Sequence, residues 1–306
     1  MEYGIQITGD YDHVLDMAHV ASERGLAAVG LPDHYLMALD EEKAKTTSAN
    51  DAFMQMAGLA RETSDIDLVM LVSPITFRHP AVIAKSAITI HNMSGGRFRL
   101  GVGTGWMDRE HEVFGFDYPP MAERFTRLEE AMAYLIAVLD PASPGFEGTH
   151  YALEPFPIAP APVAKLPLVI GGTGAHKTPR LAGAYADEFN IYPGDDLADR
   201  IDRMRTAATQ AGRDPDGIML SSAGQVLAAE TESDYAELLA ARASEADMTV
   251  DELEAHFEKR QTPRGTYEQV RGQLDRFESL GISRFYFQAI FAPGDLDELM
   301  KGLELH

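Results

Sequence analysis

The stretch from residue 67 to residue 102, DLVMLVSPITFRHPAVIAKSAITIHNMSGGRFRLGV, contains one strand–helix–strand unit. Asp67–Val72 and Phe98–Val102 are short apolar runs that predict buried strands, whereas Ala81–Met93 carries apolar residues at helical spacing. Two buried strands joined through a helix are parallel, because the crossover returns the chain to the same end of the sheet. The stretch therefore predicts a βαβ unit.

The same alternation continues in both directions along the chain. Further strands are predicted at Tyr3–Ile7, Ala28–Leu31, Leu168–Ile170, Glu188–Ile191, Met219–Ala229 and Arg284–Ala289. Helices are predicted at Tyr11–Arg24, Asp51–Thr63, Met121–Leu139, Ala175–Ala186, Leu197–Ala211 and Tyr267–Leu280, after Glu232 and from Asp295. Eight strands that alternate with helices indicate a single α/β domain over residues 1–306, closed as a (β/α)8 TIM barrel. The alternative is an open doubly wound sheet, but its usual GxGxxG turn is missing after Ile7.

Two insertions interrupt this rhythm, in the connections after the fourth and seventh strands. Pro141–Lys165 is rich in proline, which predicts an extended excursion with a short hairpin over one mouth of the barrel. Glu230–Arg260 is acidic on helical periodicity, which is typical of a solvated helical face.

The chain is strongly acidic, with 48 Asp and Glu against 26 Lys and Arg and a formal net charge of −22. Such a surface repels phosphate backbones and anionic lipid, so we expect neither nucleic acid nor a membrane as partner. The chain has no cysteine, which excludes disulfides, thiolate zinc sites and iron–sulfur clusters. The opening residues lack a signal-peptide pattern, and no apolar run reaches the roughly 18 residues of a membrane span. A cytoplasmic protein is expected.

Active sites of such barrels lie at the carboxyl ends of the strands, which directs attention to four segments. They are Pro32-Asp33-His34, Ser73-Pro74 with Arg78-His79-Pro80, Gly101–Trp106 (GVGTGW) and Gly171–Gly174 (GGTG). Asp33-His34 places a carboxylate beside the commonest acid/base side chain, although a turn-capping Asp with a neighbouring His is the ordinary alternative. A metal centre is not expected, because no HxH or HExxH pair occurs.

The two glycine-rich segments each have a functional and a structural interpretation. Gly171–Gly174 opens a helix, where backbone N–H groups face an anion, and Lys177 and Arg180 follow closely; the alternative is a flexible turn. Gly101–Trp106 allows backbone to approach a flat ligand, or serves tight packing at the barrel rim.

Taken together, these segments resemble the bacterial-luciferase-like superfamily of flavin- and deazaflavin-dependent oxidoreductases, and particularly its coenzyme F420-dependent branch. The most specific part is Ser73–Trp106, with TFRHPAVIAK, SGGR and LGVGTGW at family spacing. LPDH at Leu31–His34 and PLVIGGTGAHKTPRLAGAYADEFN at Pro167–Asn190 are also similar. With RGTYEQVRGQLDRFESLGISRFYFQ near the C-terminus, the resemblance covers nearly the whole chain.

The resemblance implies a deazaflavin ring in the C-terminal mouth of the barrel, with its phosphate on the glycine run after the fifth strand. His34 is the expected proton donor or acceptor, and Asp33 is expected to orient it or to bond the ring. Leu71-Val72 falls where relatives carry a bulge with a non-prolyl cis peptide. The implied cofactor-binding residues are Asp33, Leu71, Val72, Ser73, Arg78, Thr104, Gly105, Trp106, Gly171, Gly172, Thr173, Gly174 and Ala175. Arg78, Lys177 and Arg180 are expected to offset the acidic field near an anionic cofactor.

The expected function is F420-dependent hydride transfer to or from a small organic substrate, in a homodimer by family resemblance. In F420-dependent glucose-6-phosphate dehydrogenases a glutamate used in proton transfer follows GVGTG, whereas this chain has Trp106, which disfavours that substrate. Glu110 and His111 lie near enough in sequence to substitute. Two alternatives remain: an FMN-dependent monooxygenase and a non-catalytic flavin- or deazaflavin-binding protein.

Overall fold

Eight parallel strands close into a barrel in the computed structural model, which describes residues 1–47, 49–290 and 292–305. The strands are β1 (Glu2–Gln6), β2 (Ala28–Leu31), β3 (Asp67–Met70), β5 (Phe98–Gly103), β8 (Leu168–Gly172), β9 (Glu188–Ile191), β10 (Met219–Gln225) and β13 (Arg284–Gln288). They pair in chain order, and the pairs Leu68–Phe98 and Val69–Arg99 join β3 to β5. Pairing of the first strand with the last, β1 with β13, completes the circle, so the predicted barrel is confirmed.

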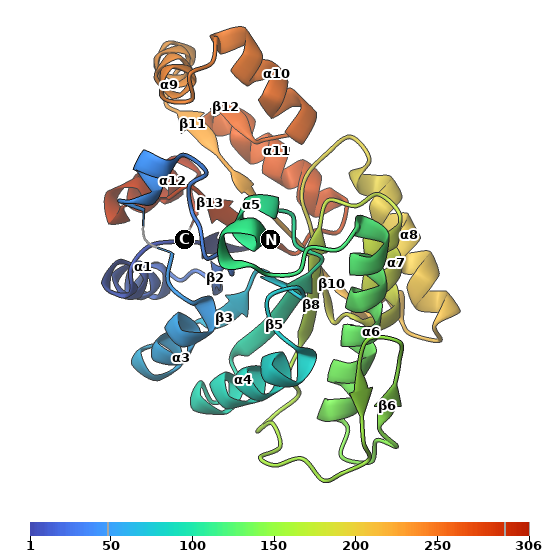
Figure 1. Cartoon of the computed structure of the whole chain (residues 1–306). Coiled ribbons are helices and arrows are strands. Elements are labelled where there is room, and N and C mark those ends of the chain that lie inside the picture. The colour runs from blue at the N-terminus through green and yellow to red at the C-terminus, as the bar shows by residue number, and fades with distance from the viewer. Residues whose placement is uncertain (48, 291, 306) are drawn as a thin grey trace.

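Helices surround the barrel because each buries one apolar face on the strands (Figure 1). They are α1 (Tyr11–Glu23), α3 (Ala52–Glu62), α4 (Pro80–Met93), α6 (Met121–Leu139), α7 (Lys177–Tyr185), α8 (Leu197–Gln210), α11 (Tyr267–Ser279) and α12 (Pro293–Gly302). Two short helices in the connections, α2 (Glu41–Ala44) and α5 (Asp108–Phe114), were not predicted. No helix in the described part of the chain combines the length and apolarity needed to cross a bilayer.

The strand predicted over Asp67–Val72 is shorter than expected. β3 ends at Met70, a cis peptide joins Leu71 to Val72, and the chain resumes as β4 (Ser73–Pro74), paired with the end of β5. The side chain of Val72 turns toward glycines on the neighbouring strands: a Cβ atom at Gly171 would lie 2.8 Å from it, and one at Gly103 3.0 Å. These glycines therefore leave room for the break in the strand.

The segment 141–165 forms the expected hairpin, from β6 (Phe146–Glu147) and β7 (Ala152–Leu153). It does not lie over a mouth of the barrel, as the sequence suggested. Glu130 of α6 accepts backbone N–H groups of residues 149–151, and Lys85 of α4 donates to the carbonyl of Ala159. The hairpin is therefore held on the outer helices (Figure 1).

The strand predicted over Met219–Ala229 is two strands. β10 ends at Gln225, and β11 (Leu227–Ala229) pairs outside the barrel with β12 (Arg264–Thr266). Between them lie α9 (Glu232–Glu245) and α10 (Val250–Arg260), which project from the barrel (Figure 1). These helices share an apolar cluster of Leu227, Leu239, Ala243, Leu253 and Phe257, so the acidic insertion has a small core of its own and is more than a solvated face.

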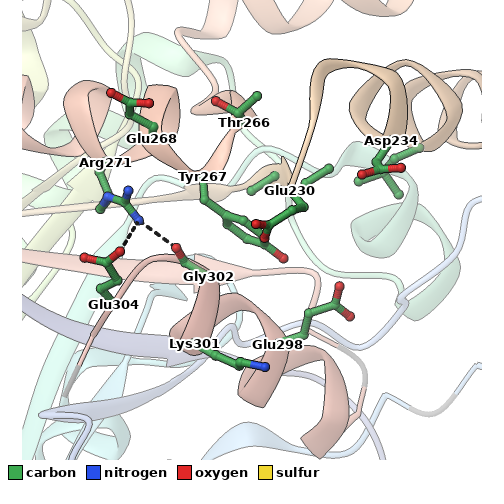
Figure 2. A pocket seen from close by; sticks show the side chains of 13 residues that line it. Glu230, Asp234, Thr266, Tyr267, Glu268, Arg271, Glu298, Lys301, Gly302 and Glu304 are labelled. Carbon is green, nitrogen blue, oxygen red and sulfur yellow. Dashed lines mark hydrogen bonds and ion pairs between the residues drawn. The ribbon is translucent and has the colours of Figure 1, made fainter.

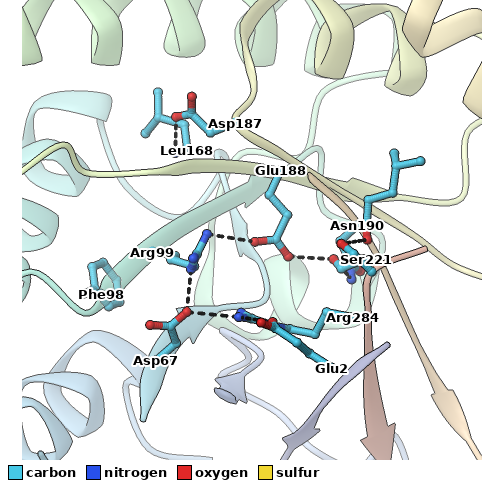
Figure 3. A network of polar contacts seen from close by, with 12 residues as sticks. Glu2, Asp67, Phe98, Arg99, Leu168, Asp187, Glu188, Asn190, Ser221 and Arg284 are labelled. Carbon is cyan, nitrogen blue, oxygen red and sulfur yellow. Dashed lines mark hydrogen bonds and ion pairs between the residues drawn. The ribbon is translucent and has the colours of Figure 1, made fainter. Parts of the chain in front are cut away.

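A network of charged side chains fills the amino ends of the strands (Figure 3). Glu188 is fully buried, accepts a hydrogen bond of 2.6 Å from Ser221, and lies 3.5 Å from the guanidinium of Arg99. Arg99 and Arg284 both contact Asp67. Burial raises the pKa of the Glu188 carboxyl, while Ser221 and the two arginines act in the opposite direction. Charge pairs therefore occupy this end of the barrel, opposite the carboxyl ends of the strands where ligands of such barrels bind.

Candidate functional site

The segments after β2, β4, β5 and β8 meet at the carboxyl end of the barrel, as parallel pairing requires. His34 is held there by a residue from α5: its Nδ1 lies 2.9 Å from Oε2 of Glu110. Oε1 of Glu110 accepts the backbone N–H groups of Tyr35 and Leu36 at 2.5 and 2.8 Å. One buried carboxylate thus fixes both the imidazole and the loop that carries it.

Asp33 makes different contacts from those expected. It is fully buried, accepts a hydrogen bond of 2.6 Å from Ser73 Oγ, and is bound by both terminal nitrogens of Arg78. Arg78 also donates to Asp51 at 2.6 Å. The orienting contact to His34 that was expected from Asp33 comes instead from Glu110.

Burial and charge pairing oppose each other in this group of side chains. Burial raises the pKa of the Asp33 carboxyl, and Arg78 and Ser73 partly offset the rise. Burial also acts on Asp51, but hydrogen bonding and attraction from Arg78 outweigh it, so the pKa of Asp51 is lowered. Arg78 is therefore occupied by two carboxylates. It fixes the loop and is not a free cation for an anionic ligand.

The segment after β5 is fixed from behind by Arg124 of α6. Its guanidinium donates to the carbonyl oxygens of Gly105 and Thr104 and lies 4.0 Å from the ring centre of Tyr118. Trp106 remains 67% exposed and approaches the ring of His34 edge-on at 5.7 Å. An aromatic surface therefore borders the imidazole at the mouth.

His111, the other candidate near Trp106, has no free nitrogen. Its Nδ1 lies 2.8 Å from the carbonyl of Met107, and its Nε2 lies 2.7 Å from Oγ1 of Thr76. Nε2 thereby joins α5 to the segment after β4, while Nδ1 bonds the residue that precedes α5. His111 is a structural residue here.

The peptide between Leu71 and Val72 is held by a chain of amides that the sequence did not reveal. Gln6, the last residue of β1, donates to the carbonyl of Leu71 at 2.5 Å. Gln288, the last residue of β13, donates to Gln6 and, at 3.0 Å, to the hydroxyl of Tyr192. Three strand ends therefore fix the position of this peptide in the floor of the mouth.

The glycine run continues β8 as far as Gly172 and leads into α7, which begins at Lys177, two residues later than predicted. No side chain caps this helix, so its first N–H groups remain available to a ligand. A Cβ atom at Gly174 would lie 2.4 Å from Oγ1 of Thr178. Thr178, which the sequence did not single out, thus has its hydroxyl directly beside the run.

The three cations expected to offset the acidic charge differ in their surroundings. Arg78 is bound to Asp33 and Asp51, and Arg180 pairs with Glu129 at 2.7 Å. Lys177 has no ion pair among the residues that the structure describes, and its Nζ lies 5.2 Å from the ring centre of Phe125. The carbonyl of Ala175 accepts a hydrogen bond from Arg203. Lys177 is therefore the cation best placed to meet an anion.

A cavity of about 820 Å³ lies between β11, α11 and α12, away from the predicted site residues (Figure 2). Arg271 is occupied there by the carbonyl of Gly302 and by Glu304. The remaining charged side chains that line the cavity are four carboxylates and one lysine: Glu230, Asp234, Glu268, Glu298 and Lys301. An anionic cofactor is repelled by this lining, and none of the predicted site residues lies in it. Elsewhere in the described chain, no group of three His, Asp or Glu side chains is arranged to hold a metal.

Comparison with known proteins gives matches over most of the chain. The family described as luciferase-like monooxygenase matches residues 2–284. An F420-dependent glucose-6-phosphate dehydrogenase of Microbacterium testaceum is 32% identical over 68% of this chain and 61% of its own length. Pyrimidine monooxygenase RutA of Allorhizobium ampelinum is 32% identical over 56% of this chain and 48% of its own. The chain thus aligns with about half to three fifths of these relatives.

A solved structure with the same fold is that of an F420-dependent secondary alcohol dehydrogenase in complex with an F420-acetone adduct. It superposes with a TM-score of 0.79 at 19% identity, over 99% of this chain and 98% of that one. At this identity the likeness concerns the barrel fold.

Proposed function

Because this chain belongs to the luciferase-like monooxygenase family, we propose that its barrel mouth binds coenzyme F420 and that it is an oxidoreductase acting on a small organic substrate. The observation that carries the proposal is His34, an imidazole oriented by Glu110 at the mouth that also contains the glycine run. The F420-dependent relatives among the matches support this cofactor, while a monooxygenase of the same fold that was solved in complex with FMN keeps FMN as the alternative.

The residues present fit the phosphate of such a cofactor. The first turn of α7 lacks a side-chain cap, and Gly174 stands where a Cβ atom would meet Thr178. We assign the phosphate to the backbone of Gly171, Gly172, Thr173, Gly174 and Ala175, with Thr178 and Lys177 beside it. This choice is consistent with the acidity of the chain, because backbone N–H groups and one lysine supply the local positive potential.

The ring is assigned to the floor and walls of the mouth. Leu71 and Val72 supply apolar contact from the peptide that Gln6 holds, and the next residue, Ser73, donates a hydrogen bond to Asp33. Thr104, Gly105 and Trp106 form the rim on the side of β5. In this assignment Arg78 contributes indirectly, by fixing Asp33.

When bound, the deazaflavin supplies a carbon centre that gives or accepts a hydride. His34 then has the proton-transfer role: its Nδ1 is held by Glu110, and its Nε2 has no hydrogen-bond partner within residues 1–47, 49–290 and 292–305. An imidazole fixed in this way is able to take a proton from a substrate hydroxyl or to return one. The exposed face of Trp106 favours a substrate with an apolar part, and its indole has no acid/base function at neutral pH.

Replacing Gly174 with aspartate is expected to weaken F420 binding by at least about tenfold, because the carboxylate repels the phosphate and its Cβ displaces Thr178. The matched control is Gly272→Asp, which adds the same charge on the exposed surface of α11, where a Cβ meets no atom within 4 Å. Fluorescence titration measures both. Equal affinities for the two variants would remove the glycine run from the site.

Activity is tested by following F420 reduction, or F420H2 oxidation, in the presence of alcohols, enones and imines. Turnover with at least one class supports an enzyme. Tight F420 binding with no turnover across the panel would favour the non-catalytic alternative.

A further inference from the structure

We propose that Glu110 is a positioning residue that fixes the tautomer of His34, so that Nδ1 carries the proton and Nε2 presents its lone pair to the mouth. The catalytic meaning of this inference rests on the proposed function. The tautomer itself is a property of the protein without any cofactor and is testable as such.

Glu110 receives hydrogen bonds from the backbone of the loop that carries His34. The side chain of Glu110 is 1% exposed, so each of its two oxygens must find a hydrogen-bond partner within the protein. The backbone N–H groups of Tyr35 and Leu36 can only donate, and both reach Oε1. Two such donors favour an ionised carboxylate, which has no proton of its own to give.

The remaining oxygen then decides the state of the imidazole. Oε2 lies 2.9 Å from Nδ1 of His34, and an acceptor at that position requires a proton on Nδ1. In the neutral ring the proton is consequently absent from Nε2. A histidine held in the other tautomer presents an N–H to the mouth and is unable to accept a substrate proton, so Glu110 determines whether His34 acts as a base.

No other carboxylate in the described part of the chain is placed to take over this function. Asp33, the neighbour in sequence, has its oxygens bound to Ser73 and Arg78. The imidazole also contacts Trp106 edge-on. This contact packs against the ring and bonds neither nitrogen.

Glu110→Gln separates this function from the fixing of the loop. The amide oxygen still accepts from Tyr35 and Leu36, which leaves only the amide nitrogen to face His34. That nitrogen donates, so Nδ1 must become the acceptor and the proton must move to Nε2. The substitution therefore reverses the tautomer while it keeps the two backbone hydrogen bonds.

The test is ¹⁵N NMR of histidine-labelled protein without cofactor, recorded over a pH series that includes the neutral ring, with His34 assigned by its loss in His34→Ala. The wild type is expected to show a protonated Nδ1 and an unprotonated Nε2, and Glu110→Gln the reverse. A proton on Nε2 in the wild type, or the same tautomer in both proteins, would overturn the proposal. The wild-type spectrum alone identifies the tautomer, so the test holds even if the variant folds poorly.

Glu112→Gln is the matched control, because Glu112 lies on the same helix, loses the same charge and has its side chain 64% exposed in a pair with Arg109. It is expected to leave the spectrum of His34 unchanged. In the loaded enzyme Glu110→Gln is expected to lower kcat by at least about tenfold, with F420 affinity within about threefold of wild type. Failure of F420 to bind would refute the proposed function and leave the tautomer result standing.

Discussion

His34→Ala is expected to lower turnover by about 10²- to 10⁴-fold, the range lost when a positioned acid/base group is removed. Affinity for F420 is expected to stay within about threefold, because the phosphate contacts are assigned to the glycine run on the other side of the mouth. Steady-state kinetics and fluorescence titration on the same preparation measure the two quantities.

The control for this experiment is His256→Ala, since His256 is exposed on α10, outside the barrel. It is expected to retain full turnover. If His34→Ala lost affinity and turnover by the same factor, His34 would be a ring-binding residue without a separate role in proton transfer.

Arg78→Met is expected to lower the free energy of unfolding by about 3–5 kcal/mol, because it leaves the Asp33 carboxylate buried without its charged partner. The methionine still covers the ring of Phe53, over which the guanidinium lies at 4.7 Å, so the loss comes chiefly from the charge. Urea denaturation monitored by circular dichroism provides the measurement.

Arg180→Met is the matched control, since Arg180 is 52% exposed in its pair with Glu129. Its cost is expected to stay below about 1 kcal/mol. The double variant Asp33→Asn with Arg78→Met should recover part of the lost stability. Equal costs for the two arginine substitutions would show that Asp33 does not depend on Arg78.

The effect of Arg78→Met also depends on pH. Burial already raises the pKa of Asp33 in the folded protein, and loss of the arginine removes the main opposing influence. A carboxyl whose pKa is higher in the folded than in the unfolded state binds more protons when folded, so the stability of the variant falls as pH rises. Its deficit against wild type is therefore expected to be larger at neutral pH than at mildly acidic pH.

The sequence was sufficient for the barrel because periodicity and connection order both point to it. Eight apolar runs separated by helices have few ways to pair, and the boundaries of Ala28–Leu31 and Glu188–Ile191 were predicted to the residue. The two misread strands, Asp67–Val72 and Met219–Ala229, contain no proline and no charged residue inside the run that would indicate a break. Their breaks depend on tertiary features, the glycines that face Val72 and the pairing of β11 with β12.

The candidate site was predicted at the level of segments and less well at the level of contacts. Topology alone brings the ends of parallel strands together, which places His34 and the glycine run at one mouth. Whether Asp33 turns toward His34 or toward Arg78 depends on the path of the loop. The spacing of residues does not indicate that path. Gln6, Gln288 and Tyr192 lie at strand ends with no unusual pattern, so the amide chain was not predictable.

Side-by-side titration of the purified protein with F420 and with FMN, followed by fluorescence, tests the central claim most directly. F420 is expected to bind at least about tenfold more tightly than FMN, a difference of about 1.4 kcal/mol in binding free energy. Tighter binding of FMN would contradict assignment of the mouth to F420 and favour the flavin-dependent alternative.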